Sequence, residues 1–264
     1  MPLKIFMEGK MENLIQILVC FFAGMGAGLG TGFAGLSAAA VISPMLITFL
    51  DFPAYEAIGI ALASDVLASA VSAYTYGKSK NIDLKNGLIM LISVLIFTLI
   101  GSFVASFVPD TTMGSFSKFM TLLVGIKFIV KPIMKKETEK QIENENRKII
   151  KSIIAGSIIG FICGFIGAGG GMMLLLVLTS ILNYDLKTAV GTSVFIMTFT
   201  ALTGAISHFA INKTVDLKIM ILCIIFTFIW ARIGAWWANR ADEKKLNRVT
   251  GIVLTFLGII MLFF

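Results

Sequence analysis

Two long apolar blocks, at residues 14–50 and 150–182, constrain the fold of this chain more than any other feature. A transmembrane helix needs only about 20 residues, so each block is too long for a single span. Both blocks carry glycines near the middle and are apolar at both ends. Lipid-exposed irregular backbone is not tolerated inside a membrane. We therefore expect each block to form two segments, either a re-entrant hairpin or a broken helix, joined by a Gly-rich break that faces the protein interior.

The rest of the chain continues the alternation of apolar blocks and short charged connectors. The 264 residues are 57% hydrophobic and 14% charged, whereas soluble domains carry about 25% charged residues. This composition predicts an all-α polytopic protein of the cell (cytoplasmic) membrane, with the lipid bilayer as its surroundings. The formal net charge of +7 comes from Lys and Arg in the connectors and does not indicate a nucleic-acid partner. The shorter blocks are 54–77, 84–108, 114–132, 187–211, 216–239 and 246–264.

A charged stretch, "KPIMKKETEKQIENENRKIIK" at residues 131–151, divides the chain almost in half. It predicts a cytoplasmic linker between a first membrane repeat, residues 1–130, and a second, residues 152–264. The two halves resemble each other, as is common in transporters. A constant offset aligns Gly24, Gly28 and Gly32 with Gly156, Gly160 and Gly164, and one inserted residue later it aligns "KNIDLK" with "KTVDLK".

Two topologies are compatible with this duplication. If each long block enters the membrane and returns, three transmembrane helices remain in each half and the halves are inverted. If each long block crosses once, the chain has eight spans and the halves are parallel. The distribution of Lys and Arg places the linker inside in both arrangements. The length of the segments favours the inverted repeat.

The glycines have two different roles in this interpretation. The regularly spaced ones put small residues on one helix face, which is typical of close packing between membrane helices. The denser cluster, Gly167, Gly169, Gly170 and Gly171, suits a turn that exposes backbone N–H groups and starts a new helix, where anions bind well. Gly35 and Ser37 hold the same place in the first half. We expect the two breaks to meet and form an anion site without a charged side chain; the alternative is a purely structural turn.

Several motifs resemble the sulfite exporter TauE/SafE family of membrane permeases. They are "GAGGG" at 167–171, "AVGTS" at 189–193, the His208-x7-Asp216 pair and the duplicated layout. The resemblance implies transport of sulfite, sulfonates or related small sulfur-containing or organic anions across the cytoplasmic membrane. It also favours Thr192 and Ser193 as substrate-binding residues, because hydroxyl groups can donate to an anion. Alternatively, both hydroxyls bond to carbonyls of their own helix.

Three ionisable residues inside apolar blocks are candidates for coupling or gating. Asp65 could carry a coupling proton or bind a cation, or it could be a hydrogen-bonded packing residue. His208 is the single histidine, and it could take part in proton coupling or be passive. Arg232 could attract the anion or pair with Asp65, or it could extend to a membrane interface marked by nearby tryptophans.

Catalytic chemistry is not indicated by any motif. The three cysteines lie in apolar blocks without metal-ligand spacing, and no nucleophile–base arrangement can be assembled. We expect no enzyme activity, no metal and no cofactor. The sequence favours a secondary transporter that works by alternating access around the two breaks, with a small anion as substrate. A passive anion channel and a membrane-embedded enzyme are the alternatives. The coupling ion, a proton or sodium, and assembly into a homo-oligomer stay open at this point.

Overall fold

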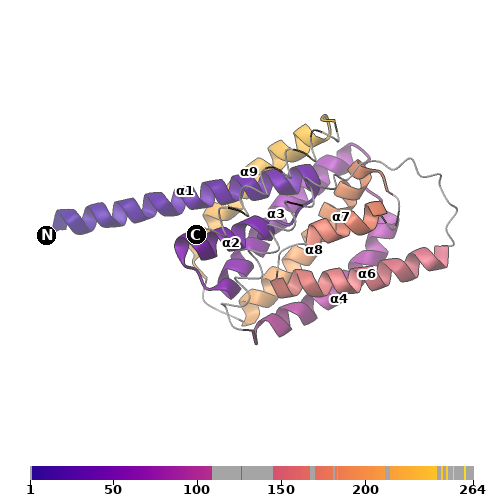
Figure 1. The fold of residues 1–264 in the computed structure, drawn as a ribbon, viewed down its shortest axis with the longest axis horizontal. Helices are drawn as coiled ribbons and strands as arrows, with labels where there is room; N and C mark the ends of the chain where they lie inside the picture. Colours follow the sequence, from indigo (N-terminus) through magenta and orange to yellow (C-terminus); the bar gives the residue numbers. More distant parts are fainter. Residues whose placement is uncertain are drawn as a thin grey trace.

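In the computed structural model, every regular element of the described chain is an α-helix (Figure 1). The structure describes residues 2–108, 145–166, 170–180, 184–211 and 215–242, with single residues at 126, 182, 245, 248, 252 and 259. The predicted span 114–132, the last block 246–264 and the linker up to residue 144 lie almost entirely outside the described residues. The helices are α1 (Pro2–Ala34), α2 (Ala39–Leu50), α3 (Ala54–Lys78), α4 (Leu84–Ala105), α6 (Glu145–Ile166), α7 (Gly170–Ser180), α8 (Leu186–Ile211) and α9 (Leu217–Ala238).

Both long blocks divide into two helices at their Gly-rich positions. The first block breaks between α1 and α2, and the second breaks between α6 and α7. At the end of α1, Gly35 has φ +62°, a left-handed conformation that glycine adopts readily. The N–H groups of Gly35 and Leu36 donate to the carbonyls of Thr31 and Gly30, at 3.0 and 3.2 Å. Two carbonyls in the last turns of α1 are thereby paired at the break, in keeping with the need to satisfy backbone groups inside a membrane.

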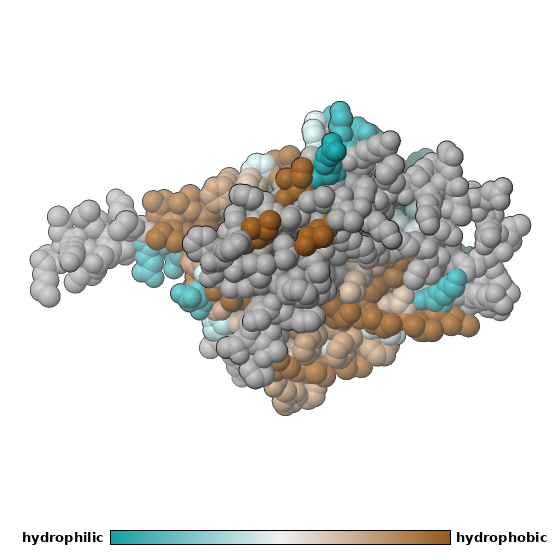
Figure 2. All heavy atoms as spheres, in the orientation of Figure 1, coloured by the Kyte–Doolittle hydropathy of each residue, from teal (hydrophilic) through white to brown (hydrophobic). Residues whose placement is uncertain are grey.

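Five described helices are long and apolar enough to cross a membrane. Two further apolar helices, Ala39–Leu50 and Ile149–Phe165, are shorter. On the face shown in Figure 2, hydrophobic residues cover much of the coloured surface along the helices, and hydrophilic residues gather toward their ends. This distribution suits a polytopic membrane protein. The five candidate spans are Glu12–Ala34, Ala54–Lys78, Leu84–Ala105, Leu186–Ile211 and Leu217–Ala238.

Polar contacts at one end of the bundle fix the directions of four helices. Asn81, which follows α3, donates to the side chain of Asn239, which follows α9, at 3.1 Å. Lys187 at the start of α8 donates to the carbonyl of Asn239 at 2.9 Å. Tyr184, just before α8, donates to Asp83, just before α4, at 2.6 Å. Thus α3 and α9 end where α4 and α8 begin, and we call this the basic end because Lys78, Lys80, Lys85, Lys187 and Arg240 lie near it.

Contacts at the opposite end complete this arrangement. The backbone N–H of Asp216, which precedes α9, donates to Glu56 in the first turn of α3 at 3.0 Å. Lys218 at the start of α9 donates to Gln16 of α1 at 2.7 Å. Helices α1, α3 and α9 therefore run toward the basic end, while α4 and α8 run away from it.

Small residues let two pairs of helices approach closely. A Cβ added at Gly28 would lie 2.5 Å from the Thr227 carbonyl of α9. In the second pair, the nearest atoms to a Cβ at Gly156, Gly160 and Gly164 of α6 are the carbonyl oxygens of Met90, Val94 and Thr98 of α4. The residue numbers of these glycines and of their neighbours in α4 increase together, so α6 runs parallel to α4. The two helices lie side by side in Figure 1. This is the packing role that the spacing of these glycines predicts.

Helix α6 begins at Glu145, within the stretch predicted as a linker. The end of that stretch, residues 145–151, is therefore continuous with the helix that carries Gly156, Gly160 and Gly164. The boundary predicted at residue 152 lies inside this helix.

Candidate functional site

The first turn of α7 touches the break between α1 and α2. Gly171 lies in the first turn of α7, and a Cβ added to it would collide with the carbonyl oxygen of Gly35 and the sulfur of Met197. The same Cβ would lie 2.9 Å from the backbone N of Ser37. A glycine is thus required at this position for the first turn of α7 to rest directly on the break between α1 and α2.

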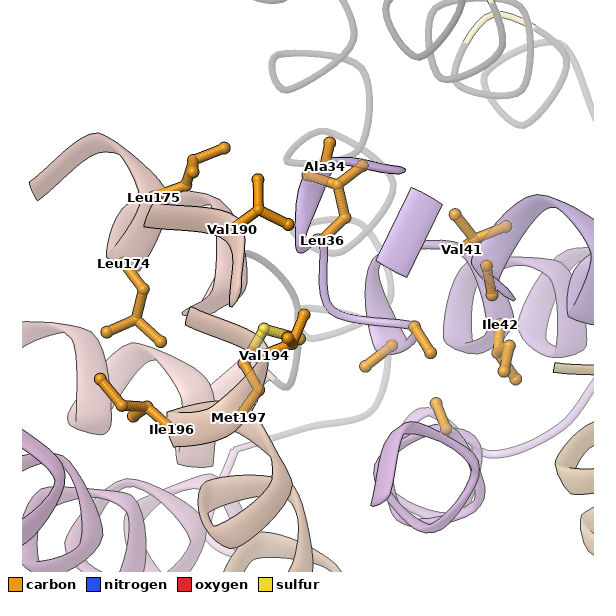
Figure 3. Close-up of a cluster of buried hydrophobic side chains, with 14 of the residues drawn as sticks. Ala34, Leu36, Val41, Ile42, Leu174, Leu175, Val190, Val194, Ile196 and Met197 are labelled. Carbon is orange, nitrogen blue, oxygen red and sulfur yellow. The ribbon is translucent and has the colours of Figure 1, made fainter. Parts of the chain in front are cut away.

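Ser193 of α8 packs against Gly35 at the same contact between α7 and the α1–α2 break. Its side chain is fully buried, and its Oγ donates to the carbonyl of Val190 at 2.8 Å. A Cβ at Gly35 would meet this Oγ, so Gly35 is confined by its neighbour as well as by its own conformation. Figure 3 shows the apolar surroundings of this region, with Leu36 beside Val190 and Met197 near Val194.

Asp65 of α3 also reaches this break. Its side chain is only 1% exposed, and its Oδ2 accepts a hydrogen bond from the Ser37 hydroxyl at 2.7 Å. Its Oδ1 is buried and has no hydrogen-bond partner in the part of the chain that the structure describes. An ionised carboxylate with so few partners costs several kcal/mol to bury. The sequence predicted an anion site without a charged side chain, and the Asp65 carboxyl group lies beside the α1–α2 break, next to Ser37.

Sulfur and hydroxyl groups from the second half line the same region. The Cys163 thiol of α6 lies within electrostatic reach of Asp65 and within hydrogen-bonding reach of Thr200. A Cβ at Gly170 would lie 3.0 Å from the sulfur of Cys163. We call the predicted substrate-binding residues that the structure brings together the break cluster, namely Gly35, Ser37, Gly170, Gly171 and Ser193, and the coupling candidate Asp65 lies next to it. Gly167 and Gly169 lie outside the described residues.

Thr192, although adjacent to Ser193, serves a different contact. Its Oγ1 accepts a hydrogen bond from the backbone N–H of Asp83 at 3.0 Å. The Asp83 carboxylate in turn caps α4 by accepting from the N–H of Asn86 at 3.1 Å, and it accepts from Tyr184. Burial, together with this carboxylate, raises the pKa of Tyr184, which keeps its hydroxyl a donor. Thr192 therefore helps to hold the basic end together and is not part of the break cluster.

His208 binds the end of α6 and not the break cluster. Its Nε2 lies 3.1 Å from the carbonyl oxygen of Gly164. A carbonyl can only accept, so Nε2 carries the proton in this contact. The ring stacks on Tyr55, with 4.2 Å between the ring centroids. This arrangement gives His208 a structural role in the observed conformation.

Tyr76 makes the matching contact in the first half. Its hydroxyl donates to the carbonyl of Gly32 at 3.1 Å. The offset that aligns Gly32 with Gly164 also aligns Tyr76 with His208. Our sequence analysis did not identify Tyr76, and applying the repeat offset to His208 would have found it.

Arg232 is exposed on α9, whereas Asp65 is buried, so the two do not form the ion pair considered from the sequence. Near it, the guanidinium of Arg240 lies 4.0 Å from the centre of a Trp236 ring, and both Trp236 and Trp237 are exposed. Aromatic and basic residues of this kind are typical of a membrane interface. The structure thus separates Arg232 from the break cluster.

Comparison with known proteins shows to which family the chain belongs. The family model described as "Sulfite exporter TauE/SafE" matches residues 20–261. The chain belongs to the sulfite exporter TauE/SafE family. The resemblance noted from the sequence motifs is therefore confirmed. No solved structure gives a significant match.

Two curated relatives of this TauE/SafE protein come from Bacillus subtilis (strain 168). "Probable membrane transporter protein YdhB" is 24% identical over 250 residues, which cover 95% of this chain and 100% of the relative. "Probable membrane transporter protein YunE" is 23% identical over 244 residues, which cover 88% of this chain and 89% of the relative. Family and fold together identify an integral membrane protein of a transporter family. Among the described residues, no group of three or more His, Cys, Asp or Glu could hold a metal ion.

The Gly164 contact makes a prediction about His208. Replacing His208 with glutamine retains an N–H donor that can reach the Gly164 carbonyl, so we expect a stable, active TauE/SafE protein. Replacing His208 with alanine removes this donor and leaves the Ser102 hydroxyl, at 3.3 Å, as the remaining partner of the Gly164 carbonyl, which should cost about 0.5–1.5 kcal/mol. Thermal unfolding in detergent and substrate flux in liposomes measure the two effects. Loss of flux in a stable His208→Gln variant would contradict the structural role and favour proton coupling through His208.

Proposed function

We propose that this protein is a secondary transporter of small anions, with the break cluster as its substrate site. The observation that carries the proposal is the direct contact between Gly171 of α7 and Gly35 of the α1–α2 break. The first turn of α7 directs backbone N–H groups and the positive end of the helix dipole toward this region, and both attract anions. The family model, described as a sulfite exporter, supports sulfite, sulfonates and related sulfur-containing or organic anions as substrates.

We also propose that the two halves form an inverted repeat. The sequence offset pairs α1 with α6, α3 with α8 and α4 with α9. In each pair, one helix runs toward the basic end and the other runs away from it, which supports inversion. The packing contacts between the halves follow the same pairing. Gly28 of α1, in the first half, packs on Thr227 of α9, in the second half. The matching Gly160 of α6, in the second half, packs on Val94 of α4, in the first half. The excess of Lys and Arg favours the basic end as the cytoplasmic one.

Inverted repeats provide a simple route to alternating access. When the halves exchange conformations, a site between them becomes accessible from the other side of the membrane. At the basic end, the contacts of Tyr184 with Asp83 and of Lys187 with Asn239 would have to open for this exchange. At the opposite end, the contact of Asp216 with Glu56 would have to open in the alternate state. The anion would reach the break cluster from one side at a time.

Counterflow of radiolabelled sulfite tests this function. The purified protein is reconstituted into liposomes loaded with unlabelled sulfite, and uptake of external labelled sulfite is compared with protein-free liposomes. A carrier predicts saturable uptake that depends on internal sulfite and is inhibited by sulfonates. Flux that does not saturate and is not stimulated by internal sulfite would favour a passive channel, and chemical conversion of the label would favour an enzyme. Folded protein without any sulfite flux would contradict the proposed substrate.

A further inference from the structure

We propose that Asp65 is the binding site of a coupling proton, so that the protein transports its anion together with a proton. The inference rests on the transport function proposed above and adds the identity of the coupling ion and of the residue that carries it. It depends on the hydrogen bonds of Asp65, on the atoms around it and on its link through Ser37 to the break between α1 and α2.

The hydrogen bonds of Asp65 suit a protonated carboxyl group. Oδ2 accepts from Ser37, while Oδ1 is buried without a hydrogen-bond partner among the described residues. A charged carboxylate here would have the Ser37 hydroxyl and the backbone of Ala38 as partners, which do not offset the cost of its complete burial, so the neutral form is favoured. In this conformation the proton resides on Oδ1, and Oδ2 remains the acceptor for the Ser37 hydroxyl.

The atoms around Asp65 favour a proton over a metal cation. Hard cations need several oxygen ligands at once. In the described region, the neighbours of the break include the sulfur atoms of Cys163 and Met197, and Gly171 covers the carbonyl oxygen of Gly35. Among the described residues, the hydroxyl group that bonds directly to the Asp65 carboxyl group is that of Ser37, which is poor for sodium but sufficient for a proton.

Protonation of Asp65 and binding of an anion should favour each other. Ser37 joins the Asp65 carboxyl group to the break, and its backbone N lies next to Gly171. An ionised Asp65 would repel an anion at this contact, and a neutral Asp65 would not. By linkage, the proton and the anion then increase each other's affinity, by about 5–150-fold for coupling of ordinary strength. The Asp65 proton is therefore taken up with the anion on one side and released with it on the other.

Among the described residues, the charge of Asp65 acts on one other titratable side chain near the break, the Cys163 thiol of α6. Within the part of the chain that the structure describes, the interactions that act on the Asp65 carboxyl group come from the Ser37 side chain and the backbone of Ala38, and neither carries a charge. The pH dependence of coupling should therefore report Asp65 itself.

Sulfite accumulation driven by a pH gradient tests the proposal. Liposomes with wild-type protein, Asp65→Asn or Ser64→Ala are given an inward proton gradient and labelled sulfite. Ser64 is the matched control, because it is buried beside Asp65 and its hydroxyl donates to the carbonyl of Ile60 in its own helix, at 2.9 Å. One coupled proton predicts about tenfold accumulation per pH unit in the wild type and the control. Sulfite itself binds and releases protons identically in every sample, so differences in sulfite accumulation between the variants come from the protein.

Asp65→Asn is expected to retain counterflow and to lose the gradient-driven accumulation. Accumulation by Asp65→Asn equal to the wild type, or accumulation driven by a sodium gradient, would overturn the inference. If Asp65→Asn does not fold, Ser37→Ala replaces it. This change removes a donor that stabilises the ionised carboxylate, so the pH of half-maximal transport should rise. An unchanged pH profile would overturn the inference.

A second measurement separates this inference from the proposed function. Infrared difference spectra of wild-type and Asp65→Asn protein should contain the carbonyl band of a protonated carboxylic acid that belongs to Asp65. Absence of the band in folded wild-type protein contradicts the proton site. A wild type that has the band but shows no sulfite counterflow contradicts the proposed function and leaves the proton site standing.

Discussion

Replacing Gly32 with alanine is expected to destabilise the protein by about 1–3 kcal/mol, the usual cost of forcing a methyl group into a packed interior. A Cβ at Gly32 would lie 2.5 Å from the carbonyl oxygen of Ala231 and 2.5 Å from the backbone N of Ala235. Both neighbours are backbone atoms of α9, so no side chain can rotate away. The two helices must separate, and the hydrogen bond from Tyr76 to the Gly32 carbonyl is strained at the same time.

Gly234 provides a matched control on the same interface. A Cβ there would have its nearest neighbours at 3.4 Å, which is ordinary van der Waals contact. Because alanine is the better helix former, Gly234→Ala should be neutral or slightly stabilising. Thermal unfolding and denaturant unfolding of the two variants in one detergent measure the difference. Equal stability of Gly32→Ala and Gly234→Ala would show that the α1–α9 interface is looser than the structure indicates.

Replacing Gly171 with alanine should abolish sulfite counterflow, with a loss of at least about tenfold, which corresponds to about 1.4 kcal/mol. The added methyl group would collide with the Gly35 carbonyl oxygen and with the Met197 sulfur. The first turn of α7 would then be pushed off the break between α1 and α2. We expect this change to affect substrate binding most, because it separates the two elements that form the proposed site.

Gly170→Ala is the neighbouring comparison. Its methyl group would meet the side chain of Cys163, at 3.0 Å from the sulfur, and not a backbone carbonyl. We expect a smaller loss of counterflow, which Cys163→Ala should partly reverse by making room. Monodispersity and thermal unfolding of each variant show whether the protein is folded before flux is compared. Normal counterflow by folded Gly171→Ala would contradict the break cluster as the substrate site.

Much of the architecture could be predicted from the periodic and compositional pattern of the chain. The excessive length of two apolar blocks predicted two breaks, and the structure places them at residues 35–38 and between α6 and α7. The spacing of Gly24, Gly28 and Gly32 predicted a packing face, because small residues three to four positions apart share one side of a helix. The length of an apolar block and the spacing of glycines along a helix are local features, so both can be recognised directly in the sequence.

The composition of the candidate site was harder to predict. Ser37 and Asp65 were both singled out, but their hydrogen bond joins different helices and has no sequence signal. Thr192 and Ser193 were treated as a pair, yet a helix turns by about 100° per residue, so the two side chains face different neighbours. One contacts Asp83 at the basic end, and the other contacts Gly35 at the break.

The sequence by itself determined that this chain is an all-helical membrane protein with two glycine breaks, and its motifs pointed to its transporter family. Only the tertiary structure decided which distant residues meet. Gly171 contacts Gly35 and Asp65 contacts Ser37 because α7 and α3 converge on the same break, while Arg232 is left on the surface. The physical reason is that hydrophobic length and helix periodicity depend on neighbours along the chain, whereas the partners of a buried polar group depend on how whole helices pack.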